Sequence, residues 1–491
     1  MERFKRRDFI KSTMLAGMGS AMINPGPVMA GDNDLKANEV TKRSPSWKAK
    51  KIIVGGGGIG GLCTAYELMK KGHEVVVMEA SGRHGGHVFT ARDGLSDGLY
   101  GDYGQEHITK PGYDRYWKYI EEFEEVVALK YPRREHVLRR IEDKFYTEEM
   151  LHDPAVLSGF GFNKKEVKFL TENPLWNFRS LYFEPYLDKF TDEYQPFGVG
   201  YDDLDTVPMA DLYKKGGASE TGMRFLGGHN SSALFTLWQA AILKLRGVPL
   251  VPQDLYRMKG GNQMLPNAFA KRLGHRVLMN CAITSIKQGD SGVTVAYTRF
   301  NKQEEMSADY YVNCIPLPAF KNIPVEPPMP PEKRYIFENI AYDSYQRFVF
   351  QAASKFWEED GLKSINLDLG HADLWSVWRS AEEVDTHRVI ILGTGPGGVS
   401  PQRALAALRS LYPGKSDTIE QVVSQDWTKS KISPTCERLP FAMGTLHKFW
   451  PHLMEPRGRI YFAGAYADNL NWGTEAATRS ANRVADQIDR L

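Results

Sequence analysis

The sequence has few cysteines and no excess of charge of either sign. Its four cysteines, Cys63, Cys281, Cys314 and Cys436, are widely spaced among 491 residues and match no metal-binding pattern, so no metal site is expected. We interpret the first three as buried apolar residues. The 62 Lys and Arg residues nearly balance the 60 Asp and Glu residues. This balance argues against nucleic acid as a partner, because phosphate-binding surfaces need an excess of positive charge.

The sequence also lacks a hydrophobic run long enough to cross a membrane. The weakly apolar stretch of residues 14–23 is shorter than the roughly 20 residues that a span requires, so no stable membrane insertion is expected. It follows a twin-arginine pattern, KRRDFIK at residues 5–11, and precedes a small-residue site near residues 28–30. We predict a twin-arginine signal peptide over residues 1–30, a linker over 31–49, and export to the periplasm or the medium. The alternative is a basic N-terminus with a short amphipathic helix.

No internal repeat or low-complexity segment is visible. The chain is too long for one hydrophobic core, and its 42% hydrophobic residues are ample for two. These features indicate a globular enzyme of at least two domains. The oligomeric state stays open, with a homo-oligomer as one possibility.

A glycine-rich turn near the N-terminus lies between a strand pattern and a helix pattern. Residues 51–54 read as a buried parallel strand and run into GGGGIGG at 55–61. A helix is predicted over 62–71 and a second strand over 74–78, with Glu79 at its end. This is a complete dinucleotide-binding unit of strand, glycine turn, helix, strand and acid.

The glycines of this unit have separate tasks. Gly56, Gly58 and Gly61 stand at the fingerprint positions for the tight turn, the approach to the pyrophosphate and the packing of helix on strand. The helix N-terminus faces the negative charge of the pyrophosphate. We expect the carboxylate of Glu79 to accept hydrogen bonds from the adenosine ribose.

A second glycine turn follows the acid and favours FAD over NAD. Residues 81–87 read SGRHGGH, and Gly85 and Gly86 resemble the Arg-x-Gly-Gly-Arg turn of the flavin amine oxidase family, which includes monoamine, polyamine and L-amino acid oxidases. The last arginine of that turn is replaced here by His87, a departure that affects one pyrophosphate contact. The resemblance implies that the cofactor is FAD.

The resemblance extends along the whole mature chain. It implies that Ile283 contacts the adenine side of FAD through its backbone, that the turn at Gly464 lies at the ribityl chain, and that a helix from about Thr474, reached through Asp468, points at the flavin. The matching segments are residues 258–266, 277–286, 292–295, 308–312, 354–361 and 458–464.

The family resemblance also implies the fold. We expect an α/β protein in which an FAD-binding Rossmann-like domain of the GR2 type carries an inserted α+β substrate-binding domain. The predicted FAD-binding domain comprises residues 50–110, 250–325 and 440–491, and the substrate-binding domain comprises residues 111–249 and 326–439.

Substrate-side residues are predicted by position. Trp472, just before the helix that points at the flavin, resembles an aromatic cage residue, or is a core residue between domains. Glu106 and His107 lie in the segment that passes the substrate face in this family, where they could serve a cationic substrate or be ordinary packing residues. His107 stands where venom L-amino acid oxidases carry the arginine for the substrate carboxylate. Arg92 and Arg347 are therefore the candidate cations for a carboxylate, and His107 is a weaker candidate because it would have to be protonated.

Arg347 also stands where the family carries a lysine that holds a water against the flavin N5 atom. Arginine does not lose its proton as lysine does, so reaction with oxygen is less assured and dehydrogenase activity stays open. Cys436 lies at the spacing at which monoamine oxidases bind FAD covalently, although Glu437 and Arg438 after it do not match that family.

Three hypotheses for the function follow. The first is oxidation of L-amino acids by FAD, with O2 or another acceptor taking the electrons. The second is an oxidase or dehydrogenase of polyamines or other primary amines. The third is a secreted flavin-carrying protein without turnover.

Overall fold

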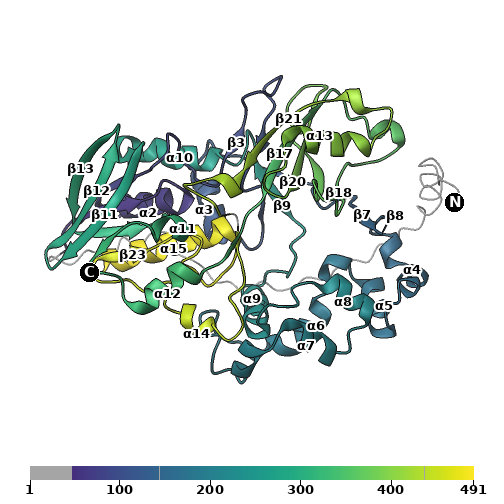
Figure 1. The fold of residues 1–491 in the computed structure, drawn as a ribbon, viewed down its shortest axis with the longest axis horizontal. Helices are drawn as coiled ribbons and strands as arrows, with labels where there is room; N and C mark the ends of the chain where they lie inside the picture. The colour runs from purple at the N-terminus through teal and green to yellow at the C-terminus, as the bar shows by residue number, and fades with distance from the viewer. Residues whose placement is uncertain (1–46, 143, 436) are drawn as a thin grey trace.

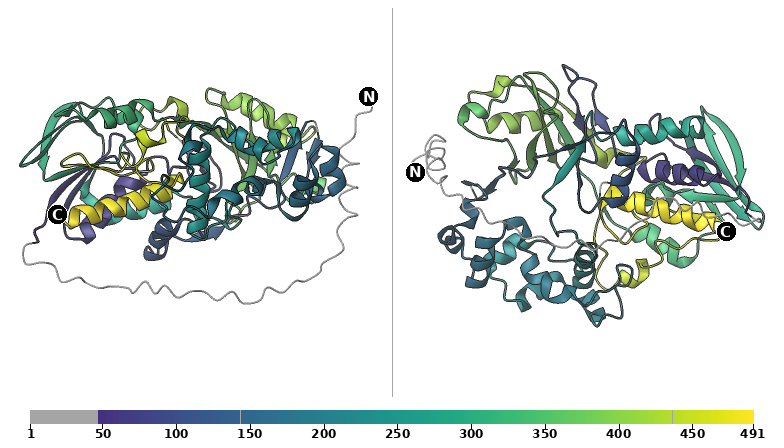
Figure 2. Two further views of the ribbon diagram at one scale, coloured as in Figure 1. Left: turned by 90° about the horizontal axis from the view of Figure 1, so that it is seen from below. Right: turned by 180° about the vertical axis from the view of Figure 1, so that it is seen from behind.

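The structure, a computed structural model, describes residues 47–142, 144–435 and 437–491. Outside these residues lie the predicted signal peptide, most of the linker and Cys436. The predictions of export and of covalent FAD attachment therefore concern residues that the structure does not describe. A parallel-sheet region, a second sheet and a cluster of helices make up the described chain (Figure 1). Figure 2 shows the same three regions from below and from behind.

The parallel-sheet region is built around five strands. Their order is β10-β2-β1-β14-β23, and every neighbouring pair is parallel. The strands are β1 (Lys51–Gly55), β2 (Glu74–Met78), β10 (Val277–Leu278), β14 (Tyr310–Asn313) and β23 (Ile460–Phe462). In β1, Ile52 and Val54 pack into one core and Ile53 into another, so the strand is buried on both faces, as its unbroken apolar run predicts. The α/β fold is confirmed.

Helices cover one face of this sheet. They are α2 (Ile59–Lys70), α3 (Asp114–Glu122), α10 (Met264–Leu273) and α15 (Gly473–Asp489), and their apolar side chains share one core with the sheet. Helix α2 begins at Ile59, three residues earlier than predicted. Gly60 and Gly61 lie within its first turn because their lack of side chains lets that turn approach Gly464 and Gly56.

A four-stranded sheet, short helices and a proline-rich connection cover the other face. The sheet has the order β13-β12-β11-β15. These elements are β11 (Cys281–Gly289), β12 (Gly292–Arg299), β13 (Lys302–Ala308), β15 (Val325–Glu326), α11 (Leu317–Phe320) and α12 (Pro331–Asn339).

The second sheet has seven strands in the order β21-β17-β20-β19-β18-β7-β8, with helix α13 (Pro401–Ser410) packed against it (Figure 1). Strand β17 (Gln346–Ala352), which lies between β21 and β20, is buried at every residue and carries Arg347. The other strands are β7 (Leu138–Ile141), β8 (Lys144–Tyr146), β18 (Leu367–Asp368), β19 (Ser376–Ser380), β20 (Val389–Gly395) and β21 (Ile419–Asp426).

The helical cluster lies below both sheets in Figure 1. Its longest member, α9, is buried on most sides. The helices are α4 (Pro154–Gly159), α5 (Lys164–Glu172), α6 (Ser180–Leu187), α7 (Met209–Lys215), α8 (Glu220–Leu226) and α9 (Ala233–Leu245). Together with the mixed seven-stranded sheet, this cluster confirms the α+β part of the fold prediction. The exact domain boundaries stay a prediction.

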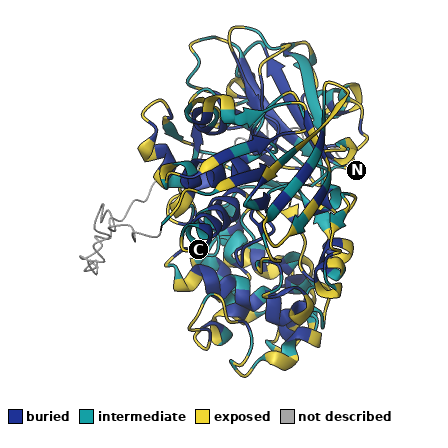
Figure 3. Cartoon of the chain, turned by 90° about the vertical axis from the view of Figure 1, so that its left-hand side faces the viewer, coloured by how far each residue is buried: buried dark blue, intermediate teal, exposed yellow. Residues whose placement is uncertain are grey.

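Smaller elements connect the three regions. Two of them, β16 (Tyr342–Asp343) and β22 (Glu437–Arg438), form an isolated antiparallel pair. The others are β3 (Thr90–Ala91), β4 (Gly101–Asp102), β5 (Ile108–Thr109), β6 (Ala128–Lys130), β9 (Leu255–Met258), α14 (Leu446–Phe449) and the 3-10 helices Met150–His152, Leu175–Asn177, Asp202–Thr206, Gly274–Arg276, Glu358–Asp360, Ser416–Thr418 and Trp427–Lys429. In Figure 3 the sheet strands and the inner helix faces are mostly buried.

Two of the cysteines lie as predicted. Cys63 in α2 and Cys281 at the start of β11 are buried, and neither forms a disulfide. Cys314 differs, because it lies one residue beyond β14 and is only half-buried, at the wall of a cavity. Within the described part of the chain, no helix is long and apolar enough to cross a membrane.

Candidate active site

One large cavity lies beside the carboxyl ends of β1, β2 and β14. Its volume is about 960 Å³. Ligands of parallel α/β sheets bind at this edge. The residues predicted for the site that line the cavity are Gly56, Gly58, Glu79, Gly85, Gly86, Glu106, His107, Ile283, Arg347, Gly464, Trp472 and Thr474.

The two predicted glycine turns pack directly against each other. Gly58 and Gly85 form a parallel bridge, and the Gly85 N–H donates to the Gly57 carbonyl at 2.8 Å. A Cβ atom on Gly86 would lie 3.0 Å from the Gly58 Cα atom, and Gly86 has a φ of +58°. The two turns therefore form a backbone cradle that side chains would fill.

The first turns of two helices open onto this cradle. Helix α2 starts after Gly58 and helix α15 starts after Trp472, and neither has a side-chain cap. Gly473 has open space at its Cβ position, and the buried Thr474 Oγ1 has no hydrogen-bond partner among the described residues. Helix N-termini with free N–H groups bind anions and stabilise negative charge.

Glu79 lies at the end of β2 and is 6% exposed. Its Oε2 accepts from the Gly57 N–H at 2.7 Å, and its Oε1 accepts from the N–H and the hydroxyl of Ser81 at 2.8 and 2.7 Å. The carboxylate is thereby held at the edge of the first glycine turn, where the fingerprint predicts the ribose-binding acid.

Three predicted residues do not line the cavity. Gly61 packs behind the turn, since a Cβ there would lie 1.9 Å from the Gly56 carbonyl oxygen, which is the close approach predicted for the third glycine. Asp468 is buried and accepts from the Arg479 Nε at 3.0 Å. Arg92 is exposed, and its guanidinium donates to the Gly260 carbonyl. The structure does not bring Arg92 to the position of a carboxylate partner.

Glu106 lies in a cluster of cations. Its Oε1 lies 2.7 Å from the Arg133 Nε, and its Oε2 lies 3.8 Å from both Arg347 Nη1 and His107 Nδ1. Burial alone would raise the pKa of Glu106, but the nearby Arg133, His107 and Arg347 lower it to about 2. Glu106 is therefore an ionised partner of these cations.

Arg347 is 3% exposed and is one of the residues that line the cavity. Its Nη2 donates to the Gly104 carbonyl at 3.4 Å, whereas its Nε and Nη1 form no hydrogen bond with any described residue. Its guanidinium carbon lies 4.9 Å from the centre of the Trp378 ring. A buried guanidinium with unused donors is suited to a ligand oxygen.

His87, which replaces an arginine of the family turn, is neutral. Burial and the charges of Arg83 and Arg347 lower its pKa to about 3. Arg83 carries a positive charge beside the cradle and donates to the Gly86 carbonyl at 2.8 Å.

Several cavity residues were not predicted from the sequence. Tyr113 stacks on Trp472 with ring centres 5.5 Å apart, which places the predicted Trp472 in an aromatic wall. Glu437 and Arg438 of β22 also line the cavity. Nothing in the sequence around Glu437 and Arg438 marks them as cavity residues. Within the described ranges, no group of three His, Cys, Asp or Glu side chains is placed to hold a metal.

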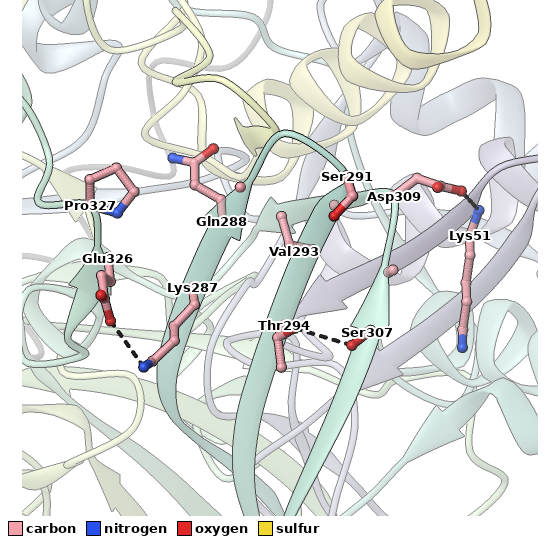
Figure 4. Close-up of a pocket in the computed structure, with 13 residues that line it drawn as sticks. Lys51, Lys287, Gln288, Ser291, Val293, Thr294, Ser307, Asp309, Glu326 and Pro327 are labelled. Atoms are coloured by element: carbon pink, nitrogen blue, oxygen red, sulfur yellow. Dashed lines mark hydrogen bonds and ion pairs between the residues drawn. The ribbon is translucent and has the colours of Figure 1, made fainter.

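A second, open depression lies on the outer face of the four-stranded sheet (Figure 4). It contains the ion pair of Lys287 with Glu326 at 3.0 Å and a contact of Thr294 with Ser307 at 3.1 Å. It holds none of the predicted site residues. The chemistry therefore belongs to the large cavity.

The fold and the cradle define a dinucleotide-binding oxidoreductase. Residues 59–489 match the model of the family described as flavin containing amine oxidoreductase. The chain belongs to this family, and its cofactor is FAD. The glycine cradle, Glu79 and the two uncapped helix starts are the residues that fit FAD.

Curated relatives cover nearly the whole chain. The chain is 25% identical over 475 residues to L-amino acid oxidase Bs29 of Bothriechis schlegelii, covering 90% of each chain. It is 25% identical over 505 residues to the putative L-amino-acid oxidase YobN of Bacillus subtilis, covering 91% of this chain and 96% of that one.

Solved structures share the fold. Cyclohexylamine oxidase from Brevibacterium oxydans superposes with a TM-score of 0.74 at 19% identity, covering 90% of this chain and 99% of that one. Putrescine oxidase bound to putrescine has a TM-score of 0.71 at 20% identity, covering 90% and 100%. The protein is therefore an FAD-dependent enzyme of the amine and amino acid oxidase family.

Proposed function

We propose that the protein oxidises L-amino acids. The observation that carries the proposal is Arg347, a buried cation at the cavity, two nitrogens of which form no hydrogen bond with any residue that the structure describes. An unpaired carboxylate in a dry cavity costs several kcal/mol, so a substrate carboxylate needs such a cation. The names of the curated relatives support the same substrate class.

FAD, when bound by the glycine cradle and Glu79, would supply the acceptor for the hydride that leaves the α-carbon of the amino acid. The protein residues bind and orient the substrate. Arg347 pairs with the carboxylate, and Trp472 with Tyr113 forms the aromatic wall that excludes water. The imine product hydrolyses to a 2-oxo acid and ammonia, and O2 takes the two electrons and becomes H2O2.

A second candidate is oxidation of primary amines or polyamines. It is favoured by His107 at the position of the venom-enzyme arginine and by the structural likeness to putrescine and cyclohexylamine oxidases. In this case the role of Arg347 is to form the ion pair with Glu106, at 3.8 Å, and it does not bind the substrate. Another electron acceptor in place of O2 is compatible with either substrate class.

Anaerobic mixing tests the proposal. Each of several L-amino acids and its decarboxylated amine is added to the oxidised holoenzyme, and bleaching of the flavin absorbance is followed. We expect faster bleaching by the amino acids. Faster bleaching by the amines supports the second candidate, and no bleaching by either class supports a flavin-carrying protein without turnover.

A matched pair of variants tests the role of Arg347. Arg347→Gln removes the cavity cation, and Arg92→Gln removes an exposed arginine outside the cavity. We expect Arg347→Gln to slow bleaching by amino acids far more than by amines, and Arg92→Gln to leave both unchanged. Equal loss for both substrate classes in Arg347→Gln contradicts the carboxylate role.

We further propose export by the twin-arginine route, supported by the KRRDFIK pattern at residues 5–11. Fusion of the first 30 residues to a reporter that only this route exports tests it. Loss of export when both arginines are changed to lysine is the expected result.

A further inference from the structure

Glu437 presents a carboxylate to the cavity. It lies in β22, keeps part of its surface exposed, and lines the cavity. Among the residues that the structure describes, none forms a hydrogen bond or an ion pair with its side chain, although its backbone pairs with Asp343. Glu106, in contrast, is already paired with Arg133 and Arg347. Glu437 is thus the cavity carboxylate that is available to a ligand.

Three charged or titratable groups act on Glu437. Asp343 stands opposite it in the β16–β22 pair, and His107 and Arg347 line the same cavity. Desolvation by the surrounding protein atoms and the charge of Asp343 raise the pKa of Glu437, against the opposing effect of His107 and Arg347. A cationic ligand beside this carboxylate would favour its ionised form.

An aromatic wall lies within range of this carboxylate. Tyr113 lines the same cavity, and the charge of Glu437 contributes to the raised pKa of its phenol. Tyr113 and Trp472 are stacked, with planes inclined by 27°. A carboxylate beside aromatic rings is the combination that binds an ammonium group, through an ion pair and the negative faces of the rings.

We propose that Glu437 recognises the ammonium group of the substrate. This inference rests on the proposed function and names the residue that holds the reacting end of the molecule. Glu437 and Arg347 both line the cavity, and their charges are complementary to the two charges of an amino acid zwitterion. The role of Glu437 also applies to simple amines, since these carry the same cation.

Two isosteric probes separate charge recognition from shape. The tert-butylammonium ion has no hydrogen on the carbon that bears nitrogen, so the flavin cannot oxidise it. Pivalate has the same tert-butyl group with a carboxylate in place of the ammonium. Binding of each to the oxidised holoenzyme is measured by isothermal titration calorimetry at pH 8, in the wild type and in Glu437→Gln and Asp343→Asn.

Asp343→Asn is the matched control. It removes a neighbouring negative charge from the same strand pair, but Asp343 does not line the cavity. Its side-chain oxygen accepts from the Ser344 N–H at 2.8 Å, which an asparagine oxygen can also do. We expect Glu437→Gln to weaken tert-butylammonium binding at least tenfold and to leave pivalate binding equal or tighter, while Asp343→Asn changes either by less than threefold.

Unchanged tert-butylammonium binding in Glu437→Gln, or equal weakening of both probes, overturns the inference. If Glu437→Gln does not fold, Glu437→Asp replaces it. The shorter carboxylate is then required to retain binding of tert-butylammonium, compared with the wild type. The probes bind without turnover, so this outcome is independent of the bleaching experiment. If amino acids bleach the flavin but Glu437→Gln binds tert-butylammonium as the wild type does, the inference about Glu437 is wrong and the proposed function stands. If Glu437→Gln weakens tert-butylammonium binding alone but no substrate bleaches the flavin, the proposed function is wrong and the inference stands.

Discussion

The imidazole of His87 stacks on the indole of Trp427, with ring centres 3.7 Å apart and planes inclined by 27°. The Trp427 Nε1–H donates to the Tyr103 carbonyl at 2.8 Å, so the indole is fixed on its other side. The second glycine turn is therefore supported by a residue more than 300 positions further along the chain.

Trp427→Ala is expected to destabilise the protein and loosen the flavin. Trp427 is 2% exposed, and truncation of a buried tryptophan costs about 3–5 kcal/mol. Trp375→Ala is the control, because that side chain is 39% exposed. Thermal unfolding followed by protein and by flavin fluorescence measures both effects. Equal melting temperatures for the two variants contradict the supporting role of Trp427.

Glu79→Ala is expected to weaken FAD binding by about 1.5–3 kcal/mol, the range for hydrogen bonds to a charged group. The same change also frees the Gly57 N–H that Glu79 now accepts from. Glu74→Ala, at the exposed start of the same strand, is expected to have little effect. The dissociation constant of FAD from the reconstituted apoprotein is the measurement, and similar values for both variants would show that Glu79 does not bind the cofactor.

Gly86→Ala is expected to abolish stable flavin binding. Its φ of +58° alone costs about 1–2 kcal/mol for a residue with a side chain, and the new Cβ would also meet Gly58 at 3.0 Å. Gly98→Ala isolates the backbone cost, because Gly98 has a φ of +70° and nothing within 4 Å. We expect Gly98→Ala to remain yellow after gel filtration and Gly86→Ala to lose its flavin. A yellow Gly86→Ala would argue against a close-packed cradle.

Asp102 gives a prediction on pH. Burial raises its pKa from 3.8 to about 6, although Thr90 and the Asn262 N–H donate to its carboxylate. The folded state then holds this proton more tightly than the unfolded state does, so the free energy of unfolding falls as pH rises between about 4 and 6, by up to about 3 kcal/mol.

Asp102→Asn removes this titration, and its amide oxygen can accept the same two hydrogen bonds. We expect the variant to be at least as stable as the wild type at pH 7 and to lose part of the decline in stability between pH 4 and 6. Urea unfolding at several pH values measures both. A variant that is less stable at pH 7 would mean that the ionised carboxylate stabilises the fold.

The cofactor side of the cavity could be predicted from the sequence because most of its residues lie close together along the chain. The strand, turn, helix and acid of residues 51–79 specify one another within a short segment, and the structure places Glu79 at the predicted edge of the turn. Arg347 was predicted only through the family resemblance, because it stands where the family carries a lysine.

The substrate half depends on segments that meet only in the folded chain. Arg92 follows the second glycine turn closely, yet its side chain points to Gly260, because neighbouring residues of an extended chain point to opposite sides. Arg133 and Glu437 come from distant segments, and nothing in their local sequence indicates that they approach Glu106 or the cavity. Their positions are set by tertiary packing.

The isolated strand pair β16–β22 belongs to none of the larger sheets. Glu437 and Arg438 therefore sit on a wall whose backbone is not shared with the strands that hold the glycine cradle. Arg438 is tied by two hydrogen bonds to Asn471, in the segment before α15, whereas the Glu437 side chain has no such bond to any described residue. If Glu437 recognises the substrate as proposed, we expect exchanges at this position to change which molecules are accepted while the strands that carry the glycine cradle stay as they are.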